Sequence, residues 1–360
     1  MEEGARVRAL VEPAAALTPA ARARFARQIR LAPFGELGQR RLAAARVLVL
    51  GAGGVGSPVI TALAAAGVGT IGIVDGDVVE TSNLPRQNAH SDADVGRSKA
   101  QSAAETARGL GAEATAYAVE FGAANADELL AGWHVVVDGF DTFGSRYVAS
   151  DAAARAGIPH VWGSALGFDG QLSVFWATAP GGGITLRDLH PAAPDDADSC
   201  ATVGVLGTVC ATIGAAMAGE AIKLITGVGE PLLGRVLVHD GLDGSWAELA
   251  LSRGAALVAE PAAIVPGAVT APELRGLLGG QHPPVVVDLR EEDEPRAVEI
   301  PGAVRMPMSR FDPEALPDGE LLVFACATGV RSRTAAESAA RAGRPSVSLR
   351  GGALAWSLSG

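Results

Sequence analysis

The sequence predicts an α/β protein in which a larger domain, built on a parallel sheet covered by helices, is followed by a smaller α/β domain. Short apolar runs alternate with helical segments over residues 46–176, and a second alternating series begins near residue 270. Such alternation is typical of helices packed on the faces of a parallel sheet. Residues 255–267 (AALVAEPAAIVPG) between the series resemble a linker. We therefore place the domains at residues 1–254 and 268–360.

The elements of both domains follow from caps, apolar runs and glycine stops. Thr18 can cap a first helix, in which Pro19 fits the first turn. The strands expected in the larger domain are residues 46–50, 70–75, 133–141, 159–165 and 170–176, and its further helices are residues 57–67, 98–111 and 145–157. The smaller domain is expected to place helices at residues 270–280 and 332–343, and strands within residues 284–290, 321–326 and 346–352.

Length, charge and cysteine usage limit the function classes. The 360 residues suffice for two cores, and a net charge of −11 argues against general nucleic-acid binding. Three cysteines are too few for a disulfide framework, and the N-terminus lacks the order of a secretory signal, so we expect a cytoplasmic protein. Residues 47–74 and 199–219 carry no charge. Glycines and small residues interrupt them, so we expect buried elements and no membrane span.

A glycine-rich turn follows the first apolar run of the larger domain. Gly51, Gly53, Gly54 and Gly56 lie between a strand and a helix. In that setting backbone N–H groups can approach phosphates at a helix N-terminus. Asp75 ends the second strand, where a carboxylate would bond a ribose hydroxyl. These residues predict a nucleotide site and, taken alone, suggest a dinucleotide-dependent dehydrogenase.

The residues that follow this acid favour ATP over a dinucleotide. Asn83, Arg86 and Gln87 stand in SNLPRQ, and a lysine, Lys99, follows DVGRS. Fixed positive groups beside a phosphate loop suit a triphosphate, and Asp141, at the end of a third strand, could hold magnesium. Only two of the 29 basic residues are lysines, which suggests that Lys99 serves a site needing a compact charge. A solvated surface lysine is the alternative.

Six motifs follow one another along residues 24–250: RFARQIRL, VLGAGGVGSP, VDGDVVETSNLPRQ, VGRSKA, VVDGFDTFGSRY and GEAIKLITG. They resemble the MoeB and ThiF adenylyltransferases, which are bacterial enzymes of the ubiquitin-activating type. VVVDLRE, EIPGAVRMP and CATGVRS in the second domain resemble a rhodanese. The combination resembles the MoeZ-type sulfur-carrier activating proteins. The resemblance implies a Rossmann-like adenylation domain followed by a rhodanese-like sulfurtransferase domain.

The resemblance also implies an activity. A small ubiquitin-like sulfur carrier ending in Gly-Gly would be adenylated on its C-terminal carboxylate with ATP and Mg²⁺, and sulfur would then displace AMP to give a thiocarboxylate. Arg86 and Lys99 would stabilise charge at the α-phosphate. Asp75 and Asp141 would hold ribose and magnesium. Arg27 would reach the phosphates of a neighbouring subunit, so a homodimer is expected. Charge at phosphorus needs preorganised cations more than proton transfer.

Cys326 is the candidate sulfur carrier of the second domain. It lies between a strand and a helix N-terminus, where the loop CATGVRS can turn N–H groups inward as an anion nest. Arg331 nearby should favour the thiolate. Four residues separate Cys326 from Arg331, one fewer than in related phosphatases, so the loop favours sulfur from a persulfide or thiosulfate donor. A degenerate domain used only for docking is the alternative.

The other two cysteines have different expected roles. Cys200 stands in a polar loop ahead of an apolar helix. By the resemblance it could form an acyl intermediate or resolve a persulfide, and an inert thiol is the alternative. Cys210 lies within LGTVCATIG, where core packing is the favoured interpretation.

The chain departs from the family in two places. The family's two Cys-x-x-Cys zinc pairs are missing, and three cysteines in total cannot form a four-thiolate site, so no zinc is expected. His190 with Asp188 is a poor substitute, and an ordinary surface histidine is favoured. Thr142 replaces the amide that follows Asp141 in the family. This change could weaken nucleotide or magnesium contacts.

Two further functions stay open at the level of sequence. One is an adenylating enzyme of the same fold that acts on a peptide or another carboxylate. The other is a docking protein with degenerate adenylation activity, suggested by the missing zinc pairs and Thr142. The identity of the carrier is also open among molybdopterin, thiamine, tRNA thiolation, cysteine and natural-product pathways.

Overall fold

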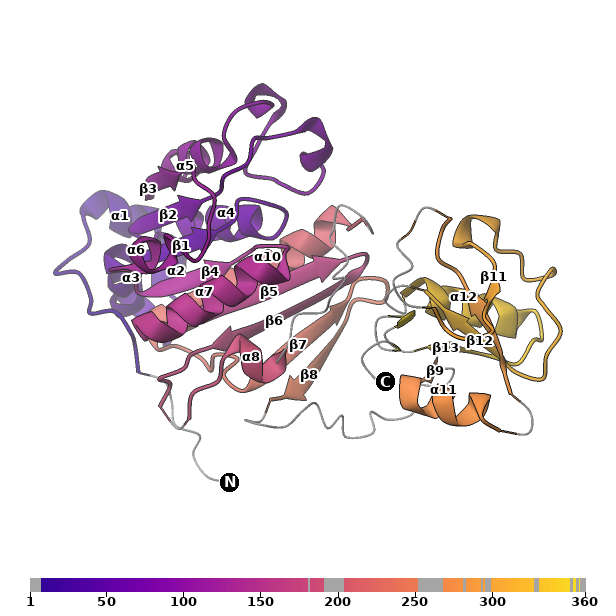
Figure 1. Ribbon diagram of the computed structural model, residues 1–360. Coiled ribbons are helices and arrows are strands. Elements are labelled where there is room, and N and C mark those ends of the chain that lie inside the picture. The colour runs from indigo at the N-terminus through magenta and orange to yellow at the C-terminus, as the bar shows by residue number, and fades with distance from the viewer. Residues whose placement is uncertain are drawn as a thin grey trace. The chain divides into compact units, whose positions relative to one another are not determined.

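The computed structural model describes residues 8–180, 182–190, 204–251, 268–280, 283–292, 294, 299–326, 330–349, 352, 353 and 356. The chain divides into two compact units (Figure 1), described here one at a time. The described part of the first unit spans residues 8–251, and that of the second spans residues 268–356. The expected linker at residues 255–267 lies outside the described residues, so its boundaries stay a prediction.

The first unit is built on a sheet of eight strands. The strands are β1 (Arg46–Leu50), β2 (Thr70–Val74), β3 (Glu113–Tyr117), β4 (Val135–Asp138), β5 (His160–Leu166), β6 (Asp169–Phe175), β7 (Arg235–Asp240) and β8 (Ser245–Ala250). Their order in the sheet is β3-β2-β1-β4-β5-β6-β7-β8. From β3 to β5 all neighbours are parallel, and from β5 to β8 they are antiparallel.

The antiparallel half is a difference from the fully parallel sheet that the sequence predicts. β5 and β6 are joined through Gly167 and Phe168 alone, and Gly167 has a φ of 60°. A two-residue connection can join antiparallel strands but is too short for the crossover that parallel strands require. The α/β fold class is confirmed, and the parallel arrangement holds only for the nucleotide-site half of the sheet.

Helices cover both faces of this sheet. The helical elements among the described residues of the unit are α1 (Pro19–Arg24), α2 (Ala26–Ile29), α3 (Gly35–Ala44), α4 (Gly56–Ala66), η1 (Thr81–Asn83), η2 (Asp92–Asp94), α5 (Lys99–Gly109), α6 (Ala126–Leu130), α7 (Phe143–Ala156), α8 (Leu186–Leu189) and α10 (Gly207–Thr226). Val47 and Val49 of β1 pack in one apolar cluster with α4, α5 and α10. Leu48 and Leu50 pack in a second cluster with α6 and α7. This alternation along the strand separates the two helical layers.

Local signals in the sequence set several of the helix ends. The Thr18 side chain accepts a hydrogen bond from the backbone N–H of Ala21, with Pro19 in the first turn, as predicted. α4 and α7 end at Gly67 and Gly157, both in the left-handed conformation that glycine adopts without steric cost. The sequence predicts one helix after Thr18, whereas the structure has two, α1 and α2, separated at Phe25.

α10 is the one helix among the described residues that is long and apolar enough to cross a membrane. In the structure 56% of the most apolar 18-residue stretch of this helix is buried inside the protein. It packs against α4, β5 and β6, and its residues Ile213, Met217 and Leu224 are fully buried in the larger apolar cluster. The helix therefore forms part of the core. This agrees with the expectation that residues 199–219 are a buried element, for those of them that the structure describes.

The second unit is a smaller α/β structure. Its elements are β9 (Ala268–Val269), α11 (Ala271–Leu278), β10 (Val285–Asp288), β11 (Val304–Arg305), η3 (Met308–Arg310), β12 (Leu322–Ala325), α12 (Val330–Arg341) and β13 (Ser346–Leu349). The five strands are parallel, in the order β11-β10-β12-β13-β9. A capping box between Thr270 and Glu273 starts α11. Val287, Leu322 and Phe324 are fully buried and form part of an apolar cluster that also contains Cys326.

Candidate functional site

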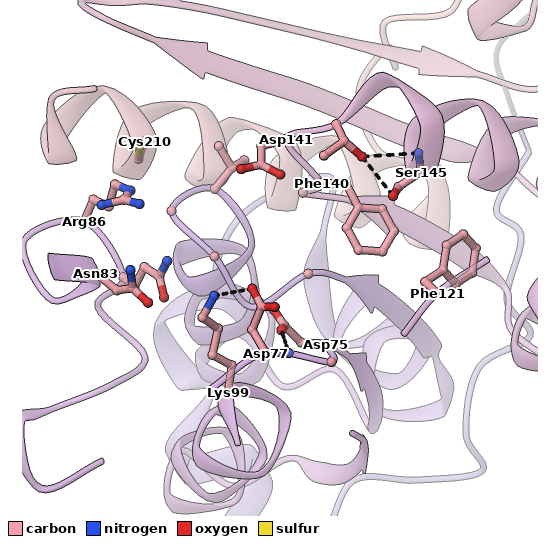
Figure 2. A pocket seen from close by; sticks show the side chains of 18 of the residues that line it. Asp75, Asp77, Asn83, Arg86, Lys99, Phe121, Phe140, Asp141, Ser145 and Cys210 are labelled. Atoms are coloured by element: carbon pink, nitrogen blue, oxygen red, sulfur yellow. Dashed lines mark hydrogen bonds and ion pairs between the residues drawn. The ribbon is translucent and has the colours of Figure 1, made fainter. Parts of the chain in front are cut away.

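A cavity of the first unit lies at the carboxyl ends of β1, β2 and β4. β1 pairs with β2 on one side and with β4 on the other. The strands that follow β1 in the sequence are therefore added first on one side of it and then, from β4 on, on the other side. Ligands of open α/β sheets bind at such a switch point. The cavity has a volume of about 460 Å³ (Figure 2). The predicted residues that line it are Gly51, Gly53, Gly54, Asp75, Asn83, Arg86, Gln87, Lys99 and Asp141.

The glycine loop has the geometry that only glycine permits at two of its positions. Gly51 has a φ of 84°, in the left-handed region. A Cβ on Gly56 would lie 1.9 Å from the carbonyl oxygen of Gly51. Gly56 does not line the cavity and instead lets the loop close tightly as α4 begins. The loop can therefore bring its backbone close to a phosphate group.

Asp75 holds this loop in place from the end of β2. One carboxylate oxygen accepts the N–H of Ala52 at 2.8 Å, and the other accepts the N–H of Asp77 at 2.9 Å. Burial raises the pKa of Asp75, and the two backbone hydrogen bonds oppose that shift. Asp75 thus both fixes the loop and presents an acceptor at the cavity wall.

His90 also holds the loop, although it is not among the predicted site residues. Its Nε2 lies 3.1 Å from the carbonyl oxygen of Ala52, and its Nδ1 lies 2.8 Å from the hydroxyl of Ser102. Ala52 is therefore held through its N–H by Asp75 and through its carbonyl by His90. Burial lowers the pKa of His90, so the neutral ring is favoured. Its position three residues after Gln87 was the available signal.

The predicted polar residues gather on one wall of the cavity. Lys99 begins α5, and its Nζ lies 2.7 Å from a carboxylate oxygen of Asp77 (Figure 2). Arg86 donates to the backbone carbonyl of Ser82 at 3.0 Å. Gln87 is 3% exposed, and its Oε1 has no hydrogen-bond partner among the described residues. A buried amide oxygen without a partner carries a desolvation cost, so Gln87 is an unusual residue in the lining of the cavity.

The loop after β4 carries Asp141 at the opposite wall. Asp138 accepts the N–H of Phe140 at 3.0 Å, which shapes the turn before Asp141. Magnesium bound with a nucleotide takes one or two carboxylates and completes its shell with phosphate oxygens and water. The exposed carboxylate of Asp141 on the cavity wall fits that use. No three His, Cys, Asp or Glu side chains in the described part of the chain group closely enough to hold a metal unaided.

Thr142 has a structural role beside Asp141. Its hydroxyl accepts the N–H of Ser145 at 3.3 Å and caps α7, and it donates to the Ser145 hydroxyl at 2.9 Å. A threonine at this position therefore keeps the start of α7 intact. Asp188, which the sequence analysis weighed as a metal ligand, accepts from Thr185 in a capping box. His190 is half-buried, not a surface residue, and its ring lies edge-on to Phe143.

Several lining residues were not among the predicted site residues. Asp77 pairs with Lys99, and the signal for it was its place two residues after Asp75. Phe121 and Phe140 bring their ring centroids to 5.3 Å on the wall of the cavity (Figure 2). Cys210 belongs to the core cluster, as expected, and also lines the cavity beside Gly54.

Besides Gly56, one described residue that was predicted for the nucleotide site lies apart from this cavity. Arg27 is an exposed residue of α2 and does not line the cavity of its own subunit. Cys200 lies outside the described residues.

The second unit places Cys326 directly after β12 and four residues before the start of α12 at Val330. The side chain is 1% exposed, and its Sγ lies 3.7 Å from the hydroxyl oxygen of Ser332. Arg331 donates from both terminal nitrogens to Glu294, with Nη2 at 2.6 Å from Oε2. The hydrogen bond to Glu294 raises the pKa of Arg331, and the neighbouring Cys326 adds to that shift. Both terminal nitrogens of Arg331 thus contact a carboxylate, which the sequence did not reveal.

Comparison with known proteins identifies both units. Residues 25–256 match the ThiF family, and residues 270–359 match the rhodanese-like domain. The chain belongs to the ThiF family. It is 42% identical to the probable adenylyltransferase/sulfurtransferase MoeZ of Mycobacterium tuberculosis, over 96% of this chain and 95% of that protein. The sequence-based assignment to the MoeZ type is confirmed.

Two further comparisons each cover 64% of this chain. The sulfur carrier protein adenylyltransferase of Thermus thermophilus is 42% identical, over 64% of this chain and 87% of that protein. A crystal structure of E. coli MccB with MccA-N7isoASN superposes with a TM-score of 0.56 at 20% identity, over 64% of this chain and 72% of that one. The MccB likeness shows the fold alone. The relatives confirm that this ThiF-family chain is an enzyme of the adenylyltransferase and sulfurtransferase class.

Proposed function

We propose that the first unit adenylates the C-terminal carboxylate of a ubiquitin-like sulfur carrier ending in Gly-Gly, and that the second unit supplies sulfur from a persulfide on Cys326. The match to a two-part adenylyltransferase/sulfurtransferase over 96% of the chain carries this proposal. The cavity supports it, because one wall combines a phosphate-type loop with Arg86 and Lys99.

In the first step a carboxylate oxygen of the carrier attacks the α-phosphorus of ATP. The bond from that phosphorus to the oxygen bridging the β-phosphate breaks, and pyrophosphate leaves. The glycine-loop N–H groups, Arg86 and Lys99 would stabilise the charge that develops on the phosphate oxygens. Asp75 would bind the ribose. Asp141 would hold a magnesium ion, whose chemical contribution is to neutralise phosphate charge. No side chain has to remove a proton, because the nucleophile is already an anion.

In the second step the terminal sulfur of the Cys326 persulfide anion attacks the acyl carbon, and AMP leaves with the electron pair of the broken bond. The product is an acyl disulfide on Cys326. A second thiolate then attacks the Cys326 sulfur, so the carrier thiocarboxylate leaves and Cys326 enters a disulfide. Cys200 or an external thiol would supply that thiolate. A further thiol reduces the disulfide, and a persulfide or thiosulfate donor reloads Cys326.

The assembly and setting are part of the same proposal. Arg27 is exposed on α2 and does not line its own cavity, which supports a role at the phosphates of a second subunit in a homodimer. The sparse cysteines and their thiol chemistry support a reducing, cytoplasmic setting.

The test uses the full chain with small Gly-Gly-ending proteins encoded by the same genome. We expect ATP–pyrophosphate exchange that depends on one such carrier, and thiocarboxylate formation when a persulfide donor is added. Cys326→Ala should keep the exchange and lose the thiocarboxylate, whereas Lys99→Met should lose the exchange. Thiocarboxylate made by Cys326→Ala at the parent rate would refute the sulfur step. Exchange with a peptide and with none of the carriers would refute the substrate.

A further inference from the structure

Cys326 belongs to a buried group of polar side chains in the second unit. Its Sγ is 3.7 Å from the hydroxyl oxygen of Ser332, and that oxygen is 2.8 Å from the hydroxyl oxygen of Ser348. The three residues are 1%, 0% and 3% exposed, respectively. Hydrogen bonds between such groups are strong where water is excluded.

The three residues come from three adjacent elements. Cys326 follows β12, Ser332 lies in the first turn of α12, and Ser348 belongs to β13. β12 and β13 are parallel, and Phe324 pairs with Ser348. The backbone carbonyl of Cys326 accepts the N–H of Ala353 at 2.8 Å, which fixes the cysteine relative to the following chain. The group is therefore set by the sheet register and by the position of α12.

The two hydroxyl groups can form a hydrogen bond with the sulfur of Cys326 in both of its ionisation states. When Cys326 is a thiol, its S–H donates to Ser332, and Ser332 donates to Ser348. When Cys326 is a thiolate, Ser348 can donate to Ser332, which leaves the Ser332 hydrogen for the sulfur. Hydrogen bonds to an ionised acceptor are roughly twice as strong as neutral ones. Reversal of these hydrogen bonds thus favours the anion.

We propose that Ser332 and Ser348 form a two-hydroxyl relay that donates a hydrogen bond to the sulfur of Cys326 when that sulfur is ionised. Ser332 contacts the reacting atom. Ser348 is a positioning residue that acts through Ser332. The relay complements Arg331, whose two terminal nitrogens contact Glu294.

Other charged groups surround the same end of the sheet. Arg331 on α12 lies close enough to Cys326 for their charges to interact, and Glu294 and Glu291 interact with Arg331. Asp288 and Arg290, at the end of β10, form a buried ion pair at 2.7 Å. The relay variants leave all of these charges in place, so a change in Cys326 ionisation can be assigned to the hydroxyl groups.

The proposal rests on the proposed sulfur step and adds residues to it. In loading, the Cys326 thiolate takes the outer sulfur of thiosulfate, so an S–S bond forms on Cys326, another breaks and sulfite leaves. In unloading onto cyanide, that sulfur becomes thiocyanate and the Cys326 thiolate is released. The relay stabilises the same anion in both half-reactions: as the attacking group first, and as the leaving group afterwards.

The experiment measures the pH dependence of Cys326 alkylation by iodoacetamide in the full chain, resolved by peptide mass spectrometry. We expect Ser332→Ala to raise the pH of half-maximal rate by about one unit and Ser348→Ala by about half a unit. Ser348→Thr should retain the parent pH of half-maximal rate because threonine keeps the hydroxyl. Ser346→Ala is the matched control, since Ser346 lies on the same strand but donates to the carbonyl of Ala336 at 2.8 Å.

The double variant separates a relay from two independent effects. If Ser348 acts through Ser332, Ser348→Ala should add nothing in a Ser332→Ala background. A full additional shift there, or a Ser348→Ala midpoint equal to those of the parent and Ser346→Ala, would overturn the relay. Thiosulfate-to-cyanide sulfur transfer by the parent chain is measured alongside. Expected midpoints without this transfer would leave the relay standing and refute thiosulfate as the donor in the proposed sulfur step.

Discussion

The ammonium nitrogen of Lys99 lies 2.7 Å from a carboxylate oxygen of Asp77 on the wall of the cavity. Lys99 is 10% exposed at its side chain, whereas Asp77 is 67% exposed. The pair therefore presents a buried cation held by a solvated acid. ATP would bring several negative charges to this pair, so the acid both positions the lysine and repels the ligand.

Asp77→Asn should tighten ATP binding. The amide keeps an oxygen that can accept from Lys99, while the repulsion between Asp77 and the phosphates is removed. We expect the dissociation constant for ATP to fall by roughly three- to tenfold at low salt and by less at high salt. Isothermal titration calorimetry at two ionic strengths measures the change. Asp92→Asn, an exposed acid of η2 that does not line the cavity, is the control. Weaker binding by Asp77→Asn would show that the charge is needed to present Lys99.

Gly56→Ala should destabilise the first unit. The added Cβ would lie 1.9 Å from the Gly51 carbonyl oxygen and 2.9 Å from its carbon, and neither backbone atom can move without opening the loop. We expect a loss of about 3 kcal/mol in the free energy of unfolding, at the upper end of the usual range for overpacking. Chemical denaturation measures it.

Gly219→Ala is the matched control for that experiment. Gly219 also lies inside a helix, and a Cβ there would meet no atom within 4 Å. The free energy of unfolding should stay level or rise by up to about 1 kcal/mol, because alanine is the better helix former. Equal losses of unfolding free energy in Gly56→Ala and Gly219→Ala would show that the close approach of Gly56 to the Gly51 carbonyl does not make alanine unfavourable at position 56.

Much of the nucleotide site could be predicted from the sequence because its signals are local. A strand, a glycine turn and a helix set the positions of Gly51 and Gly56, and parallel strands bring Asp75 and Asp141 to the same edge. What the sequence did not reveal depends on side chains meeting across the fold. His90 reaches the carbonyl of Ala52 from 38 residues away, and no periodicity reports such a contact.

The second half of the sheet and the environment of Cys326 show the same limit. Strand periodicity identifies β5 and β6, but the short Gly167 connection decides that they are antiparallel. CATGVRS predicts a reactive thiol next to Arg331. It does not indicate that Glu294, 37 residues earlier, takes both terminal nitrogens of that arginine.

Glu294→Gln should increase the reactivity of Cys326. Burial alone would raise the pKa of Glu294, but the hydrogen bond and charge of Arg331 lower it overall, so the residue is an anion beside the arginine. The amide removes that negative charge and leaves Arg331 to favour the thiolate. We expect the alkylation rate of Cys326 at pH 7 to rise by roughly two- to fivefold. Glu314→Gln, at an exposed position of the second unit, is the control, and an unchanged rate in Glu294→Gln would show that the ion pair does not affect the thiol.

His190 should make the stability of the first unit depend on pH. Burial, with a smaller contribution from the charge of Arg146, lowers the pKa of His190 to about 4. The ordinary value of about 6.5 applies to the unfolded chain. Between these two values the unfolded chain binds the proton and the folded one does not, so stability falls as the pH drops from about 6.5 to about 4. The difference of roughly 2.5 units corresponds to about 3 kcal/mol lost at pH 4 relative to pH 7.

Because carboxylates also titrate in this range, the contribution of His190 is taken from a variant. His190→Phe keeps a ring that can pack against Phe143 and Trp162, and Tyr147 still donates to the backbone carbonyl of residue 190. A Trp356→Phe background leaves only tryptophans of the first unit, so the fluorescence of urea unfolding reports that unit alone. We expect the stability lost between pH 7 and pH 4 to be smaller by about 3 kcal/mol in His190→Phe. Equal losses in the two chains would mean that the His190 ring gains a proton as readily when folded as when unfolded.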